Sequence, residues 1–170
     1  MLRRPIAWAD FNQDGNIEVL QTTGYQELAF KHLTTQYYSS SVSRAFDIDG
    51  NAGAVAKVLG AVFGADSVHN QAYVDAGLRY MDTGTYDLDS LGALAMSLRV
   101  PTENSIEICE TLWQNIVGEP ADSSDIEIYV NQLESGALGV GELVALAANT
   151  TLNSSNIGLA GMYEQGLEYI

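Results

Sequence analysis

The 170-residue chain has 7 Lys and Arg residues against 22 Asp and Glu residues, a formal net charge of −15, and 46% of its residues are hydrophobic. This length can bury one core, and the acidity argues against nucleic acid as a partner, because phosphate binding depends on clustered basic side chains. Membrane insertion is not expected either, since no apolar run approaches the roughly 20 residues that span a bilayer.

The N-terminal part, residues 1–47, is expected to form short strands and turns. Residues 34–46 read "TTQYYSSSVSRAF", a composition that suits a pleated sheet better than a helix. A helical bundle is expected to follow at residues 48–170. The fold class predicted is therefore mainly α, with a short β and loop segment at the N-terminus.

A candidate calcium loop lies within this segment, where residues 10–18 read "DFNQDGNIE". Oxygen donors at alternate positions can surround a hard cation, as in an EF-hand loop, and Gly15 permits the sharp turn. The twelfth position, where an EF-hand needs Glu, is Gln21, and the following "IEVLQTT" is strand-like, as in the calcium-binding loops of surface repeats. The alternative is a metal-free turn held by side chain to backbone hydrogen bonds. The predicted Ca²⁺ ligands are Asp10, Asn12, Asp14, Asn16 and Glu18.

A second, weaker metal candidate is the "DIDGN" stretch, with Asp47, Asp49 and Asn51. It is shorter than the first loop and less diagnostic. The alternative favoured here is capping of the first helix, because Asp and Asn near a helix start accept hydrogen bonds from free amide groups and oppose the positive end of the dipole.

Three helices are predicted next, over residues 52–64, 66–84 and 87–98. In the first, apolar residues recur at three- and four-residue spacing, and Gly64 is a plausible stop. Pro101 closes the third helix. The apolar face of the first helix comprises Val55, Val58, Leu59, Val62 and Phe63.

The same series of landmarks then occurs a second time. The helix ending at Gly64 is matched by one ending at Gly118, 54 positions later. The glycine at 84 and the leucine at 91 are matched at 136 and 143, each 52 positions later. This order predicts an internal duplication, with copies at about residues 54–100 and 107–150. Each three-helix copy has apolar faces that it cannot bury alone, so the two are expected to share one bundle.

The C-terminal tail, residues 151–170, is rich in apolar residues and is expected to dock on the bundle. Cys109 is expected to be a buried, inert thiol, because its partner in the first copy is the apolar Val55. His32 and His69 do not form a zinc-binding spacing, and no nucleophile or nucleotide motif is present. The apolar residues of the tail are Leu152, Ile157, Leu159, Met162, Tyr163, Leu167 and Ile170.

The stretch "AFDIDGNAGAVAKVLGAVFG", the Gly-ended helices and the closing "LNSSNIGLAGMYEQGLEYI" resemble a known helical module. It is common at the C-terminal ends of long bacterial secreted and cell-surface proteins and is related to the domain of unknown function 4214. Related domains carry an "R-x-P-D-x-x-G" segment between their first two helices, where this chain has "GADSVHNQAY" and "GEPADSSDIEIY". The resemblance covers residues 45–170 and implies an extracellular module of calcium-rich type I secreted (RTX-class) proteins, with no catalytic residues.

The leading functional prediction is a non-catalytic structural or assembly module, extracellular or displayed on a bacterial surface, calcium-binding, and exported without a cleaved N-terminal signal. Its partners would be the rest of a larger secreted polypeptide or identical subunits. One alternative is a self-assembling subunit of a surface layer or filament. Another is an enzyme or ligand-binding domain, which a pocket with converging polar groups would support.

Overall fold

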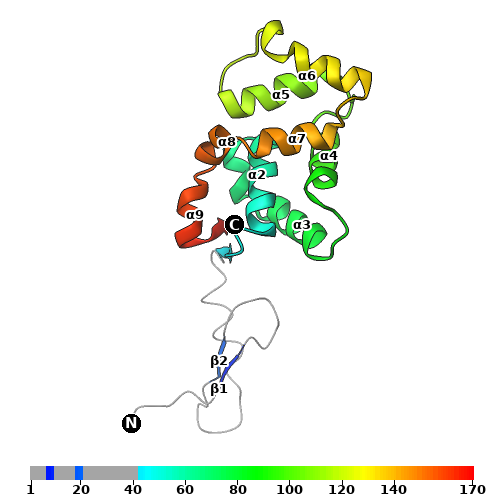
Figure 1. Ribbon diagram of the computed structural model, residues 1–170. Helices are drawn as coiled ribbons and strands as arrows, with labels where there is room; N and C mark the ends of the chain where they lie inside the picture. Colours follow the sequence, from blue (N-terminus) through cyan, green and yellow to red (C-terminus); the bar gives the residue numbers. More distant parts are fainter. Residues whose placement is uncertain (1–6, 10–17, 21–41) are drawn as a thin grey trace, which may run out of the picture. The chain divides into compact units, whose positions relative to one another are not determined.

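The computed structural model describes residues 7–9, 18–20 and 42–170. The chain divides into two compact units, Met1–Ser41 and Val42–Ile170. In the first unit, β1 (Ala7–Ala9) pairs antiparallel with β2 (Glu18–Leu20), and Trp8 lies opposite Val19 (Figure 1). Short strands in the N-terminal part are therefore confirmed at these residues.

The second unit is mainly helical, which confirms the predicted fold class (Figure 1). It begins before the expected boundary at residue 48, because β3 pairs antiparallel with β4 at the end of the chain, with Arg44 opposite Glu168. Its elements are β3 (Ser43–Ala45), α2 (Asn51–Phe63), the 3-10 helix η1 (Ala65–His69), α3 (Gln71–Asp82), α4 (Leu88–Arg99), α5 (Ser105–Val117), α6 (Ser123–Ser135), α7 (Val140–Ala148), α8 (Thr151–Asn156), α9 (Leu159–Gln165) and β4 (Leu167–Tyr169). None of the helices in the described residues has the length and hydropathy needed to cross a bilayer.

Helix α2 is the central element of this unit and contacts α3, α4, α5, α7 and α8. Its sequence consists largely of Ala, Val and Gly, and most of its residues are buried. Small residues let neighbours approach closely: a Cβ on Gly53 would overlap the carbonyl oxygen of Ile48, and one on Gly60 would overlap the Ile157 side chain. A largely apolar helix is stable only when most of its surface is covered by other elements, as that of α2 is here.

The second predicted helix differs from the structure, which divides it into η1 and α3. The break occurs at Asn70, whose backbone is extended and whose side chain accepts a hydrogen bond from the Tyr73 amide at 3.2 Å. This side chain replaces the helical partner of that amide, so α3 starts afresh at Gln71. Within η1, Val68 is fully buried, which anchors the short turn to the core.

The helix boundaries agree with the offsets of the predicted internal duplication, which stays a prediction. Helix α5 begins and ends 54 positions after α2, while α6 and α7 begin 52 positions after α3 and α4. Gly118 (φ 87°) and Gly136 (φ 70°) end α5 and α6 in the left-handed conformation that favours glycine. Leu91 and Leu143, the matched leucines of the two copies, are both buried. The two copies share one hydrophobic core.

The copies meet at equivalent positions where α4 crosses α7. A Cβ on Gly92 would lie 2.9 Å from Val144 Cγ1, and Val144 is its repeat partner. A Cβ on Gly141 would overlap the carbonyl oxygen of its own repeat partner, Asp89. Both contacts therefore join positions that the predicted duplication matches.

A third contact of this kind joins the ends of α2 and α5. Asn115 Nδ2 donates hydrogen bonds to the Ala61 and Val62 carbonyls, at 3.0 and 2.8 Å, and Ala61 is the repeat partner of Asn115. Asn156 makes a similar contact with the end of α5, because its Nδ2 donates a hydrogen bond to the Ile116 carbonyl at 2.7 Å. Asparagine amides thus satisfy helix C-terminal carbonyls that have no partner within their own helix.

The tail docks on the helical unit, as predicted. Ile157, Leu159, Met162 and Leu167 are buried, whereas the remaining apolar residues of the prediction, Leu152, Tyr163 and Ile170, are exposed. A polar residue takes part in the docking instead. Asn153 is 1% exposed, and its Nδ2 donates to the Lys57 carbonyl at 3.0 Å and to the Ala148 carbonyl at 2.8 Å.

Candidate functional site

The predicted calcium loop falls largely outside the described residues. Asp10, Asn12, Asp14 and Asn16 lie there, and Glu18 is described only as the first residue of β2, opposite Ala9. Calcium binding at this loop therefore stays a prediction. Within the part of the chain that the structure describes, no group of three or more His, Cys, Asp and Glu side chains is placed to hold a metal ion.

The residues of the second metal candidate point to three different partners. Asp47 Oδ2 accepts a hydrogen bond from the backbone amide of Asn51 at 3.1 Å, which is the helix-capping role considered above. Asn51 Nδ2 donates to Asp82 Oδ1 at 2.7 Å. Asp49 Oδ1 accepts from the Tyr163 hydroxyl at 2.9 Å. Each side chain takes part in a separate hydrogen bond, and metal binding at this stretch stays a prediction.

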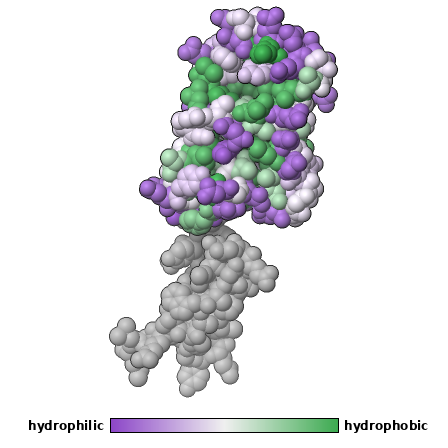
Figure 2. Space-filling model, viewed as in Figure 1, coloured by the Kyte–Doolittle hydropathy of each residue, from purple (hydrophilic) through white to green (hydrophobic). Residues whose placement is uncertain are grey.

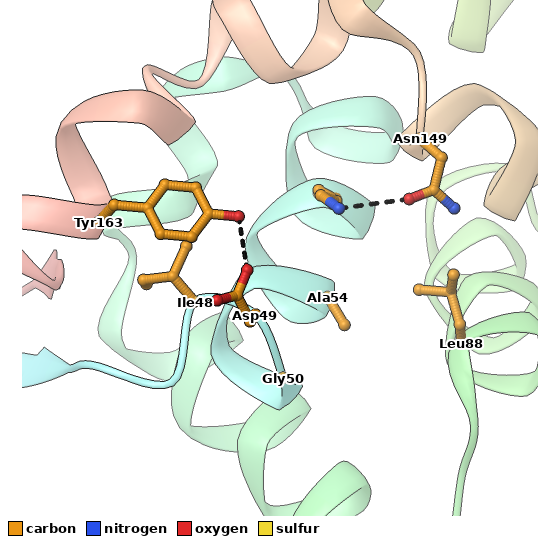
Figure 3. A pocket seen from close by; sticks show the side chains of 8 residues that line it. Ile48, Asp49, Gly50, Ala54, Leu88, Asn149 and Tyr163 are labelled. Atoms are coloured by element: carbon orange, nitrogen blue, oxygen red, sulfur yellow. Dashed lines mark hydrogen bonds between the residues drawn. The ribbon is translucent and has the colours of Figure 1, made fainter.

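A pocket of about 240 Å³ lies beside this segment (Figure 3). It forms where the first half of α2, the start of α4, the residue that ends α7 and the exposed side of α9 come together. Four polar side chains line it: Asp49, Lys57, Asn149 and Tyr163. Ile48 and Leu88 contribute apolar walls. The pocket thus combines a carboxylate, an ammonium, an amide and a phenol with apolar surface.

Lys57 is the one charged residue of α2, and its neighbours Ala56 and Val58 are buried. Its Nζ donates to Asn149 Oδ1 at 3.4 Å, the bond drawn in Figure 3. Asn149 is held in turn, because its Nδ2 donates to the Ala145 carbonyl at 3.0 Å. The ion pair formed among the described residues joins Arg44 and Glu168, so Lys57 has no carboxylate partner in that part of the chain.

On the other side of the pocket, Tyr163 and Asp49 form a hydrogen-bonded pair. Donation to the Asp49 carboxylate favours the protonated phenol and raises the pKa of Tyr163 above its ordinary value. The hydroxyl of Tyr163 therefore acts as a donor that fixes Asp49 at the rim. Both side chains are exposed, so the pair is open to solvent.

Cys109 does not contribute a reactive group. It is buried in the core, and loss of solvation raises the pKa of its thiol to about 11. The protonated thiol is a poor nucleophile at neutral pH. This confirms the expectation of a buried cysteine that followed from its pairing with Val55.

No protein-family model matches the chain, and comparison with curated proteins and with solved structures found no match. The resemblance to the bacterial secreted module therefore stays a prediction. The sequence reasoning pointed to Asp49 but not to the other polar residues of the pocket, Lys57, Asn149 and Tyr163. One signal was available, namely a single lysine within a helix of Ala, Val and Gly.

Proposed function

We propose that this chain is a non-catalytic structural or assembly module, presented outside a bacterial cell, whose acidic surface is neutralised by calcium. The observation that supports this most is the uneven charge. Every charged residue from position 100 to 170 is Asp or Glu, and these side chains are mostly exposed. Within residues 42–170 the salt bridge formed is Arg44–Glu168, at 2.7 Å.

Such a surface repels itself, which disfavours the compact state. A cation that binds the folded chain more tightly than the unfolded chain shifts the equilibrium toward folding by mass action. Low calcium inside the cell and high calcium outside would then favour folding after export. The rest of a larger secreted polypeptide, or identical subunits, would be the partner of the folded module.

Thermal and urea unfolding of the full chain tests the proposal, in chelator, in millimolar calcium and in sodium chloride of equal ionic strength. Calcium at about 100 times its Kd should add about 2.7 kcal/mol to the free energy of unfolding, while sodium chloride adds less. Identical melting temperatures in chelator and in calcium would contradict the proposal.

A loop variant with a matched control locates the calcium response. The double substitution Asp10→Asn and Asp14→Asn removes two negative charges from the predicted loop. The control, Glu127→Gln with Glu134→Gln, removes two from the exposed side of α6. The loop variant should lose the calcium-dependent stabilisation and the control should keep it. If both variants lost the calcium-dependent stabilisation equally, the effect would come from the total negative charge of the protein and not from the predicted loop.

Self-assembly is a second proposal, supported by apolar side chains at the surface. Leu98, Ile128 and Leu146 are 70%, 61% and 58% exposed. Figure 2 shows apolar residues reaching the surface of the helical unit among hydrophilic ones. Sedimentation over a concentration series, with and without calcium, tests this proposal. A monomer at every concentration would contradict it.

A further inference from the structure

Lys57 is an unusual residue for the position it occupies. Helix α2 contacts five other helices, and Lys57 is the one charged residue in it, partly buried at the lining of the pocket. The ammonium has one hydrogen bond to the described residues, and its length of 3.4 Å exceeds the usual range of about 2.7–3.2 Å. The Lys57 ammonium has three N–H donors, and the other described residues of the pocket accept a hydrogen bond from only one of them.

Asp49 supplies the complementary group in the same pocket. Its Oδ1 accepts from Tyr163, while its Oδ2 accepts no hydrogen bond from the described residues. Lys57 and Asp49 line one cavity without forming an ion pair with each other. An ammonium and a carboxylate held in this way match a ligand that carries the two opposite charges.

The size and charge of the protein narrow the class of ligand. About 240 Å³ is below the roughly 300–1,000 Å³ typical of pockets for drug-sized molecules, so the ligand has few atoms. A simple anion would be repelled by a net charge of −15, whereas a molecule with no net charge would not. Ile48 and Leu88 offer apolar contacts for a short aliphatic group.

We propose that this pocket binds a small zwitterion of the size of a free α-amino acid. The carboxylate of the ligand pairs with the Lys57 ammonium, and the ammonium of the ligand pairs with Asp49. Tyr163 keeps Asp49 in place, and Asn149 does the same for Lys57. The site is separate from the predicted calcium loop, so it goes beyond the structural role proposed above.

Amide chemical-shift titration of the full chain, in calcium-containing buffer, tests this site with glycine and L-alanine as probes. Acetate and methylammonium, at the same concentrations, carry one charge each. The amides of Gly50, Ala54 and Leu88 should shift saturably with the two zwitterions and respond at least about tenfold more weakly to either single-charge probe. No saturable shift with either zwitterion, or an equal response to acetate, would overturn the proposal.

Substitutions at Lys57 assign the response to the pocket. Lys57→Met keeps the apolar stem and should weaken zwitterion binding by at least about tenfold, while Lys57→Arg should retain it. Asp49→Asn should reduce binding of the zwitterions to the level of acetate. The control Arg99→Met removes an exposed cation from the end of α4 and should leave binding unchanged. Wild-type affinity in a folded Lys57→Met protein would refute the assignment to this pocket. The melting temperature of the same variant in calcium and in chelator is measured separately. If calcium still raises it, the proposed function stands even though the pocket proposal has failed.

Discussion

Helices α4 and α7 approach closely at Gly141, and we predict that a side chain at this position destabilises the fold. A Cβ at this position would overlap the Asp89 carbonyl oxygen and lie 2.8 Å from the carbonyl carbon. Both atoms belong to the backbone of α4, so no side-chain rotation can relieve the overlap. Gly141→Ala therefore requires the two helices to separate along the contact that joins the two copies.

The expected cost follows from two opposing effects. Alanine in a helix is favoured over glycine by about 1 kcal/mol. Overpacking a close contact costs typically about 1–3 kcal/mol, and this overlap with rigid backbone places Gly141→Ala at or beyond the upper end. We expect a net loss of about 2 kcal/mol in the free energy of unfolding, measured by urea denaturation with circular dichroism.

Gly161→Ala in α9 is the matched control. No atom lies within 4 Å of a Cβ built at Gly161, so the helix-propensity effect should act alone. This variant should be more stable than wild type by about 0.5–1 kcal/mol. If both glycine variants gained stability by similar amounts, the close approach of α4 and α7 would be refuted. A change in the urea m-value would instead indicate a change in the compactness of the folded or unfolded state.

Three further predictions concern hydrogen bonding, a salt bridge and the cysteine. Asn153→Leu leaves the Ala148 carbonyl without this buried donor and should lower the free energy of unfolding by about 2 kcal/mol in urea denaturation. Arg44→Met removes an ion pair whose side chains are about half exposed, and should cost less than about 1 kcal/mol in the same assay, with a smaller cost at high salt. Cys109 has its pKa raised from 9.0 to about 11 in the folded chain, so its contribution to stability is fully present below pH 9.0 and is lost as the pH rises through about 11. A pH series of urea unfolding of wild type and Cys109→Ala checks this, because only wild type should show the added decline.

Much of the helical unit could be predicted from local sequence. The three- and four-residue apolar spacing along 52–64 and the glycine at 64 predicted α2 to within one residue at each end, since both are local features. The division of the second helix at Asn70 was missed. An asparagine inside a helical pattern is compatible with both a cap and a continuous helix, and the backbone decides between them.

Most residues of the pocket could not be predicted from the sequence. Lys57, Asn149 and Tyr163 are separated by many positions, and only the docking of the tail brings Tyr163 to Asp49. The metal prediction at Asp47, Asp49 and Asn51 grouped residues that are close in sequence. In the structure these side chains take part in three separate hydrogen bonds, and Asp47 bonds the backbone amide of Asn51 itself.

The sequence by itself determined the negative net charge and the mainly helical class, and it predicted the duplication, because charge, apolar spacing and glycine stops can be read along the chain. Tertiary structure alone decided that Asn115 meets Ala61, that Gly141 meets Asp89 and that Lys57 opens into a pocket. The physical reason is that close packing selects among distant partners by shape, and the sequence of one segment does not specify the shape of the segment it will contact.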